Sequence, residues 1–166
     1  MGGWIMLLVA QQRPQRSAGL VGIAAAPDFT ERMRNERLDE QQLAQLASTG
    51  FCEIPNSYDD AEPYRISQAM LDDGREHLLL HREITINAPV RLIHGQLDED
   101  VPWECSLQIA RQLQSKDVQV QLVKAGDHRL SEPEDLQRLL QTIHHLRETL
   151  NNSPGGLPYT AGLAGE

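Results

Sequence analysis

The sequence lacks a long hydrophobic run and a set of cysteines. Its apolar N-terminal run, Trp4–Ala10, is far shorter than the ~20 residues that cross a bilayer, and no basic segment or cleavage pattern marks a signal peptide. Two cysteines, Cys52 and Cys105, make neither a disulfide framework nor a zinc knuckle. We therefore expect no membrane insertion and a reduced, cytoplasmic setting.

Positive charge is also scarce. Fifteen Lys and Arg residues stand against 24 Asp and Glu, which gives a net charge of -9. Because phosphate backbones are bound by clustered cations, we expect no nucleic-acid partner, and the same balance disfavours an anionic membrane surface. The length of 166 residues and the 40% hydrophobic share fit one domain with a core of its own.

Apolar patterning predicts helices and strands that alternate along the chain. A continuous apolar run predicts a buried strand at 20–26, a short strand that ends at Gly95 is predicted at 89–95, and an alternating run predicts an edge strand at 118–123. A helix is predicted over 1–12. The last helix shows apolar residues at helical spacing: Leu136, Leu139, Leu140, Ile143, Leu146 and Leu150.

Long connections between these strands predict that they run parallel in one sheet. Another helix is predicted after Pro102, with Leu107, Ala110 and Leu113 on its apolar face. The expected fold class is thus α/β, with about three parallel strands and flanking helices.

Segment 28–86 differs from its surroundings, because it is polar and broken by turn residues. It predicts a helical cap insertion rather than a second core, with helical spacing at 38–47 and 66–70 and a loop over 51–63. Residues 151–166 contain Gly, Pro and Asn without periodicity and predict a disordered tail. Residues 1–150 are then the domain.

Two polar residues follow neighbouring strands of the predicted sheet. Asp98 comes just after the strand at 89–95, and His128 comes just after the strand at 118–123. Ligands bind beyond the carboxyl ends of parallel strands, so these side chains are expected to meet there. A carboxylate that holds an imidazole in one tautomer makes the other ring nitrogen a general base.

Other readings of these and nearby residues stay open. Asp98 alone fits a plain turn, Asp100 is the fallback acid, and Asp127 more readily shapes its own turn. His77 and His81 are spaced for one helix face, but a metal site needs a third ligand, so no metal and no cofactor is expected.

The loops resemble those of a known superfamily. H-G-Q-L-D-E-D-V-P-W at 94–103 resembles the acid loop of α/β-hydrolases, and G-D-H-R-L-S at 126–131 resembles their histidine loop. Asp98 precedes His128 in the order of that superfamily. D-D-G-R at 72–75 and the V-P-W ending favour the branch of palmitoyl-protein thioesterases and acyl-glucuronide esterases. The resemblance covers about residues 1–150.

The resemblance also extends to the start of the sequence. M-G-G-W at 1–4 resembles the end of a G-x-S-x-G nucleophile elbow, with Met1 directly after the serine position. No serine of this sequence stands in such an elbow, so the nucleophile is expected to be absent. In an intact parent, the Met1 amide is expected to line the oxyanion hole.

The resemblance therefore implies a serine esterase or thioesterase that cleaves acyl esters or acyl thioesters. This chain is expected to be a fragment that is inactive alone. The alternative is a non-catalytic remnant that holds an apolar ligand or a partner. In either case, the strand at 20–26 is expected to present an unpaired edge through which the chain self-associates.

Overall fold

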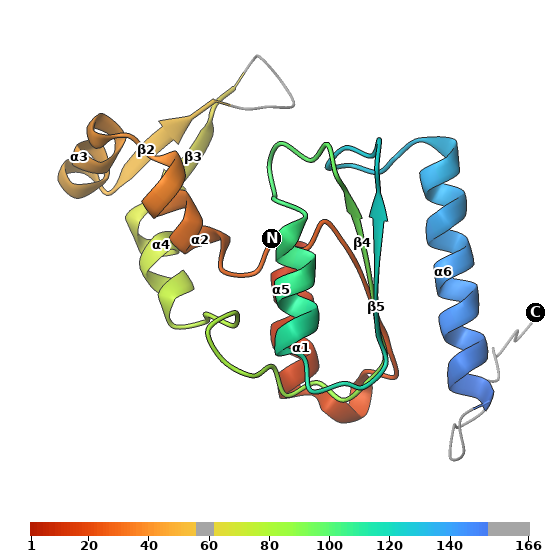
Figure 1. Ribbon diagram of the computed structural model, residues 1–166. Coiled ribbons are helices and arrows are strands. Elements are labelled where there is room, and N and C mark those ends of the chain that lie inside the picture. The colour runs from red at the N-terminus through yellow and green to blue at the C-terminus, as the bar shows by residue number, and fades with distance from the viewer. Residues whose placement is uncertain (56–61, 153–166) are drawn as a thin grey trace, which may run out of the picture.

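A computed structural model describes residues 1–55 and 62–152, in which a three-stranded parallel sheet lies between two layers of helices (Figure 1). The strand order is β1-β4-β5, with β1 at Leu20–Ile23, β4 at Val90–Gly95 and β5 at Val118–Val123. Helices α1 (Gly2–Gln12) and α5 (Glu104–Gln112) cover one face, and α6 (Pro133–Asn152) covers the other. The predicted α/β class and the parallel sheet are confirmed.

The main core fills the space between the sheet and helices α1 and α5. Strand β4 is buried along its whole length because it is the central strand. Its neighbours in the core come from both helices and from the segment before the strand: Trp4, Leu7, Ala10, Leu79, Ile84, Ile86, Ile109 and Leu113. This packing holds the carboxyl end of β4, where the acid loop begins, on a rigid base.

Strand β1 is shorter than the predicted strand at 20–26. It ends at Ile23, because Ala24 has a φ of 45° and turns the chain out of the sheet. Ala25 and Ala26 stay buried although they no longer pair. A run of small apolar residues therefore marked burial correctly, but it marked the end of the strand three residues too late. A short 3-10 turn, Pro14–Arg16, joins α1 to this strand.

The cap contains more strand than the sequence predicted. It starts with α2 (Phe29–Arg32) and a π-helical turn at Met33–Arg37 and continues with α3 (Glu40–Thr49) and α4 (Gln68–Arg75). Between these helices, β2 (Phe51–Ile54) pairs antiparallel with β3 (Tyr64–Ser67). The predicted loop over 51–63 is wrong at its start, and the predicted helical spacing at 66–70 begins in a strand; residues 56–61 lie outside the described residues.

The cap also has a small core of its own, which corrects the expectation that 28–86 lacks one. Five buried side chains from its helices and strands pack together: Leu38, Leu46, Cys52, Ile66 and Leu71. The two ends of the cap are tied by Asp28, whose carboxylate accepts the backbone N–H groups of Leu79 and Leu80 at 2.8 Å each. The insertion therefore leaves and rejoins the main domain at one place.

Two predicted helix faces differ from the observed ones. In α5, Leu113 at the end of the helix is buried as predicted, but Leu107 is 40% exposed, and Cys105 and Ile109 take the buried positions instead. In α6, Leu146 is buried, but other members of the leucine stripe are exposed: Leu136, Leu140 and Ile143. The helix has the predicted period, yet much of its apolar face is uncovered.

Residues 151 and 152 belong to α6, which shortens the predicted disordered tail, and 153–166 lie outside the described residues. None of the helices described is both long and apolar enough to cross a membrane.

Candidate active site

The acid loop after β4 and the histidine loop after β5 are packed against each other. The backbone N–H groups of Gln96 and Leu97 donate to the carbonyls of Val123 and Gly126, at 2.8 and 2.9 Å. Gly95 makes this approach possible, since a Cβ there would lie 2.2 Å from the Gly126 carbonyl oxygen. A glycine at the end of β4 is thus required by the neighbouring loop.

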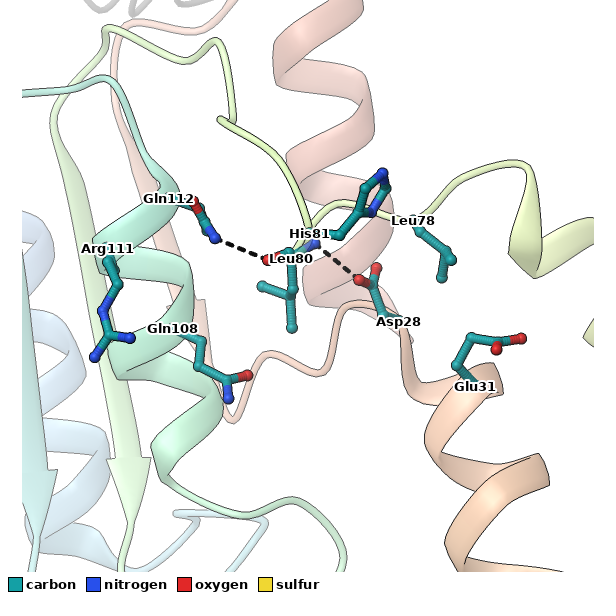
Figure 2. A pocket seen from close by; sticks show the side chains of 8 residues that line it. All are labelled: Asp28, Glu31, Leu78, Leu80, His81, Gln108, Arg111 and Gln112. Carbon is teal, nitrogen blue, oxygen red and sulfur yellow. Dashed lines mark hydrogen bonds between the residues drawn. The ribbon is translucent and has the colours of Figure 1, made fainter.

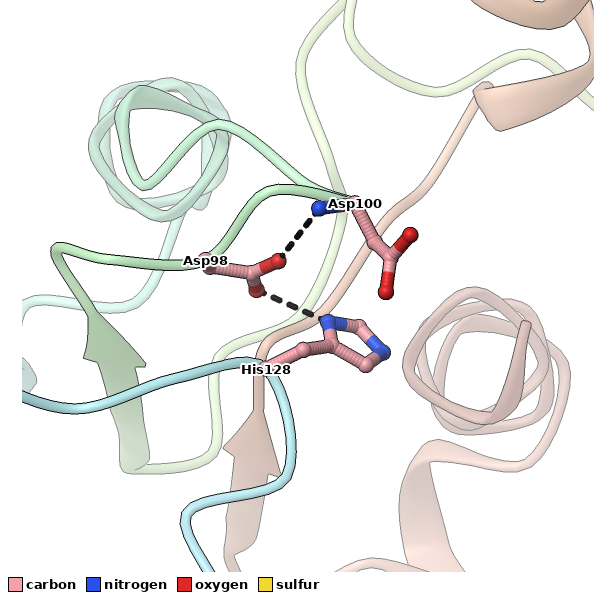
Figure 3. Close-up of side chains that lie close together, drawn as sticks. All are labelled: Asp98, Asp100 and His128. Carbon is pink, nitrogen blue, oxygen red and sulfur yellow. Dashed lines mark hydrogen bonds and ion pairs between the residues drawn. The ribbon is translucent and has the colours of Figure 1, made fainter. Parts of the chain in front are cut away.

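Asp98 lies at the bottom of this junction, with none of its side chain exposed. Its Oδ1 accepts the backbone N–H groups of Asp100 and Val101, at 2.9 and 2.8 Å. Its Oδ2 accepts from His128 Nδ1 at 2.8 Å (Figure 3). The same oxygen lies 3.1 Å from His94 Nε2. Four donors therefore surround one buried carboxylate, about as many as its lone pairs can serve.

These donors keep the carboxylate ionised. Burial alone raises the pKa of Asp98, but the hydrogen bonds from His94, from the Val101 amide and from His128 outweigh it and lower the pKa from 3.8 to about 2. An ionised acceptor makes Nδ1 of His128 the donor in the 2.8 Å bond, so the proton of a neutral ring sits on Nδ1.

His128 has the geometry of a general base. Its side chain is 33% exposed, and the nitrogen that does not face Asp98 points away from the carboxylate (Figure 3). In the neutral ring this Nε2 carries a lone pair, and the buried carboxylate stabilises the imidazolium that forms when it takes a proton. The predicted pair of Asp98 and His128 is thus brought together.

Asp100, the fallback acid, lies close but in another position. Ligand atoms of Asp98, Asp100 and His128 all lie within 4.8 Å of one another, the one such cluster among residues 1–55 and 62–152. Asp98 and His128 already bind each other through these atoms, and both Asp98 oxygens are occupied by N–H donors. This donor set suits a hydrogen-bonded pair better than a cation.

The site opens into a cavity of about 460 Å³ under the cap. His128 and Met1 share its wall with apolar cap side chains: Phe29, Met33, Ile54, Ile66 and Met70. Three arginines also line it: Arg32 and Arg37 donate to the acid loop, and Arg65 lies over the Phe51 ring, 3.5 Å from its centroid. A cavity of this size with a mostly apolar lining and a few polar groups is typical of a small-molecule site.

Arg32 and Arg37 connect the cap to the acid loop. Arg32 donates to the Asp100 carbonyl at 2.9 Å and to Cys105 Sγ at 3.3 Å. Arg37 donates to the carbonyls of Glu99 and Asp100, both at 2.8 Å. The cap therefore fixes the loop that carries Asp98 as well as roofing the cavity.

A second cavity, of about 410 Å³, lies away from this pair (Figure 2). His81 and Asp28 line it, whereas His77 lines a different and smaller cavity. Several of its polar groups already serve the fold: Asp28 ties the ends of the cap, and Gln112 donates to the Leu80 carbonyl at 2.8 Å. The two histidines are thus not joined in one site.

Three other polar residues lie near the pair, and the sequence predicted a role for one of them. Asp127 accepts the N–H groups of Arg129 and Leu130 at 3.0 and 2.9 Å, the turn-shaping role predicted for it. His94 and Ser106, by contrast, were missed as site residues. The available signal was a histidine on a strand four residues before the acid.

Comparisons with known proteins agree on one kind of relative. The model of the prolyl oligopeptidase family matches residues 1–152. The chain is 38% identical over 151 residues to the bovine (Bos taurus) protein named palmitoyl-protein thioesterase ABHD10, mitochondrial, over 91% of this chain and 49% of that protein. The chain thus spans about half the length of the curated relatives it matches.

Two solved structures have a similar fold and sequence. A putative hydrolase from Agrobacterium vitis S4 superposes with a TM-score of 0.82 at 36% identity, over 88% of this chain and 58% of that one. Alpha/beta hydrolase domain-containing protein 10 from mouse gives 0.79 at 38% identity, over 89% and 59%.

Proposed function

The chain belongs to the prolyl oligopeptidase family and has the α/β-hydrolase fold, and from this premise we propose that Asp98 and His128 are the acid and base of a serine esterase or thioesterase. The observation that carries the proposal is the 2.8 Å bond between His128 Nδ1 and Asp98 Oδ2 at adjacent strand ends. The carboxylate precedes the imidazole in the sequence, as in the α/β-hydrolase superfamily, and both follow the carboxyl ends of neighbouring strands.

The reaction follows from this pair. His128 Nε2 takes the proton of a serine hydroxyl as its oxygen attacks the acyl carbonyl, and Asp98 stabilises the imidazolium. The imidazolium then gives the proton to the leaving alcohol or thiol. Water, activated by the same nitrogen, releases the acid from the acyl-serine. In this proposal the Met1 amide supports the oxyanion, and Met1 does share a cavity wall with His128.

The serine itself is proposed to come from a segment outside these 166 residues. Their sequence contains no G-x-S-x-G elbow, and the chain spans about half of its curated relatives. We therefore expect this chain alone to lack turnover. The proposed substrate is an acyl ester or acyl thioester, supported by the apolar lining of the 460 Å³ cavity and by the name of the bovine relative, a palmitoyl-protein thioesterase.

A second candidate is a non-catalytic protein that holds an apolar ligand in the same cavity. The apolar cavity and the absence of a G-x-S-x-G elbow fit such a binding protein as well as they fit a hydrolase fragment. A cytoplasmic location is proposed for either case on the two unpaired, buried cysteines, while the curated relatives are named as mitochondrial proteins.

A serine-reactive fluorophosphonate probe separates these candidates. The purified chain is expected to stay unlabelled. A fusion that places the segment before the matching region of the Agrobacterium vitis hydrolase ahead of Met1 is expected to be labelled at the supplied serine. Labelling of the chain alone would overturn the assignment of an external nucleophile. A folded fusion that stays unlabelled would favour the binding protein.

A further inference from the structure

His94 is a second histidine on the acid of the site. Its side chain on β4 is fully buried, and its ring contacts three groups. Nε2 lies 3.1 Å from Asp98 Oδ2 and 3.1 Å from the Val101 carbonyl oxygen. Nδ1 lies 2.7 Å from Ser106 Oγ on α5, and Ser106 is fully buried as well. The ring therefore bridges the acid loop to a helix of the main core.

These partners decide which ring nitrogen carries the proton. A carbonyl oxygen only accepts hydrogen bonds, so the nitrogen facing Val101 must be an N–H group. That proton also points to the Asp98 carboxylate. With the ring proton on Nε2, Nδ1 is left to accept from the Ser106 hydroxyl.

We propose that His94 is a positioning residue for the acid–base pair: Ser106 holds it in the Nε2–H tautomer, and its Nε2–H group fixes the Asp98 carboxylate toward His128. This rests on the proposed function, since positioning matters only if Asp98 and His128 act as acid and base. The shared acceptor carries the argument, because His94 and His128 both bind Oδ2 of Asp98.

The geometry explains why two backbone amides are not enough to hold the acid. They bind Oδ1 and leave Oδ2 to be placed by the imidazoles. His128 stands on a partly exposed loop, whereas His94 stands on the central strand. A donor from the rigid strand keeps Oδ2 in place while the partner on the loop exchanges its proton.

Nitrogen-15 NMR of the histidine rings in the full chain tests this without any turnover. In the wild type, His94 is expected as the Nε2–H tautomer alone, with a slowly exchanging ring proton, and His128 as the Nδ1–H tautomer. His94→Leu removes the donor, and His94→Gln keeps an amide donor near the same place. Leu92→Ala is the matched control, because it empties a buried site on the same strand.

In His94→Leu, the Nε2–H tautomer of His128 is expected to rise at least severalfold, with partial return to wild type in His94→Gln and no change in Leu92→Ala. An unchanged His128 tautomer in a folded His94→Leu protein would overturn the proposal. An Nδ1–H tautomer at His94 in the wild type would also overturn the proposal. This measurement needs no variant, so it holds even if His94→Leu does not fold. Failure of the fluorophosphonate test with these signals intact would instead count against the proposed function.

Discussion

At the residue scale, Asp98 is the best-defined group of the site. Its two oxygens accept from four N–H donors, and none of its side chain is exposed. Removing one partner of such a network leaves a buried polar group unsatisfied, which costs more than an exposed hydrogen bond gives. The charge of Asp98 therefore contributes both to the geometry of the Asp98–His128 pair and to folding stability.

The lowered pKa of Asp98 predicts a pH-dependent stability. A carboxyl group whose folded pKa lies below its unfolded value stabilises the fold above pH 3.8, and that contribution disappears as the pH falls toward 2. The difference is worth about 2 kcal/mol. Urea unfolding of the wild type and Asp98→Asn between pH 6 and pH 2 measures it. The stability gap between the two proteins should shrink by about this amount, and a constant gap would contradict the account.

Gly95 makes a prediction about the packing of the two loops. A methyl group at this position would meet the carbonyls of Gly126 and Asp127, so Gly95→Ala is expected to separate the loops and lower the melting temperature by several degrees. Gly2→Ala is the control, because a Cβ at Gly2 has nothing within 4 Å. Equal melting temperatures for both variants would show that the contact is not needed.

At the scale of elements, the cap covers the cavity and also binds the acid loop. Arg32 and Arg37 reach from its first helical segment to the carbonyls of the acid loop. These bonds restrain a loop whose amides hold Asp98. Movement of the cap is therefore expected to change the position of the loop that holds Asp98.

Hydrogen exchange measures this coupling. Arg37→Ala removes two bonds to the loop, and if they contribute about 1 kcal/mol together, the amides of Asp100 and Val101 should exchange about fivefold faster. Arg34→Ala serves as the control, since Arg34 pairs with Asp72 inside the cap at 2.9 Å. Faster exchange of these amides in both variants, or in neither, would show that the bonds from Arg37 do not restrain the acid loop.

The elements also show what sequence can and cannot predict. The carboxyl ends of β4 and β5 and the order of Asp98 and His128 could be predicted, because the hydrophobic patterns of these two strands end shortly before the two residues; the end of β1 was predicted three residues too late. Strand β2 was missed because four residues, Phe51–Ile54, pair with a partner beyond a polar connection. The role of His94 depends on Ser106, a contact between strand and helix that no local pattern encodes.

At the scale of the whole molecule, the described part of the chain leaves apolar surface uncovered. Ile5 and Val9 of α1 are about half exposed, at 52% and 51%, and Leu140 of α6 is 57% exposed. Among the described strands, β1 pairs with β4 on one side and with no strand on the other. An unpaired strand edge beside apolar helices favours association with another polypeptide.

Self-association through the β1 edge follows from this surface. The purified chain is expected to increase in mass with concentration in sedimentation velocity runs. Ile23→Lys places a charge on β1, where Ile23 is 36% exposed, and is expected to shift the equilibrium to monomer. Leu107→Lys changes a similarly exposed leucine on α5 and should not. A wild-type chain that remains monomeric at every concentration would contradict the expectation.

The proposed roles of Asp98 and His128 as acid and base are tested most directly by kcat/KM of the fused protein on an activated acyl thioester. Asp98→Asn and His128→Gln should each lower kcat/KM by about 10⁴-fold, as expected when a triad loses its acid or its base. Asp100→Asn, in the neighbouring carboxylate, should stay within about tenfold of the wild type. Full activity without His128, or a large loss in Asp100→Asn with Asp98→Asn unaffected, would contradict the assignment.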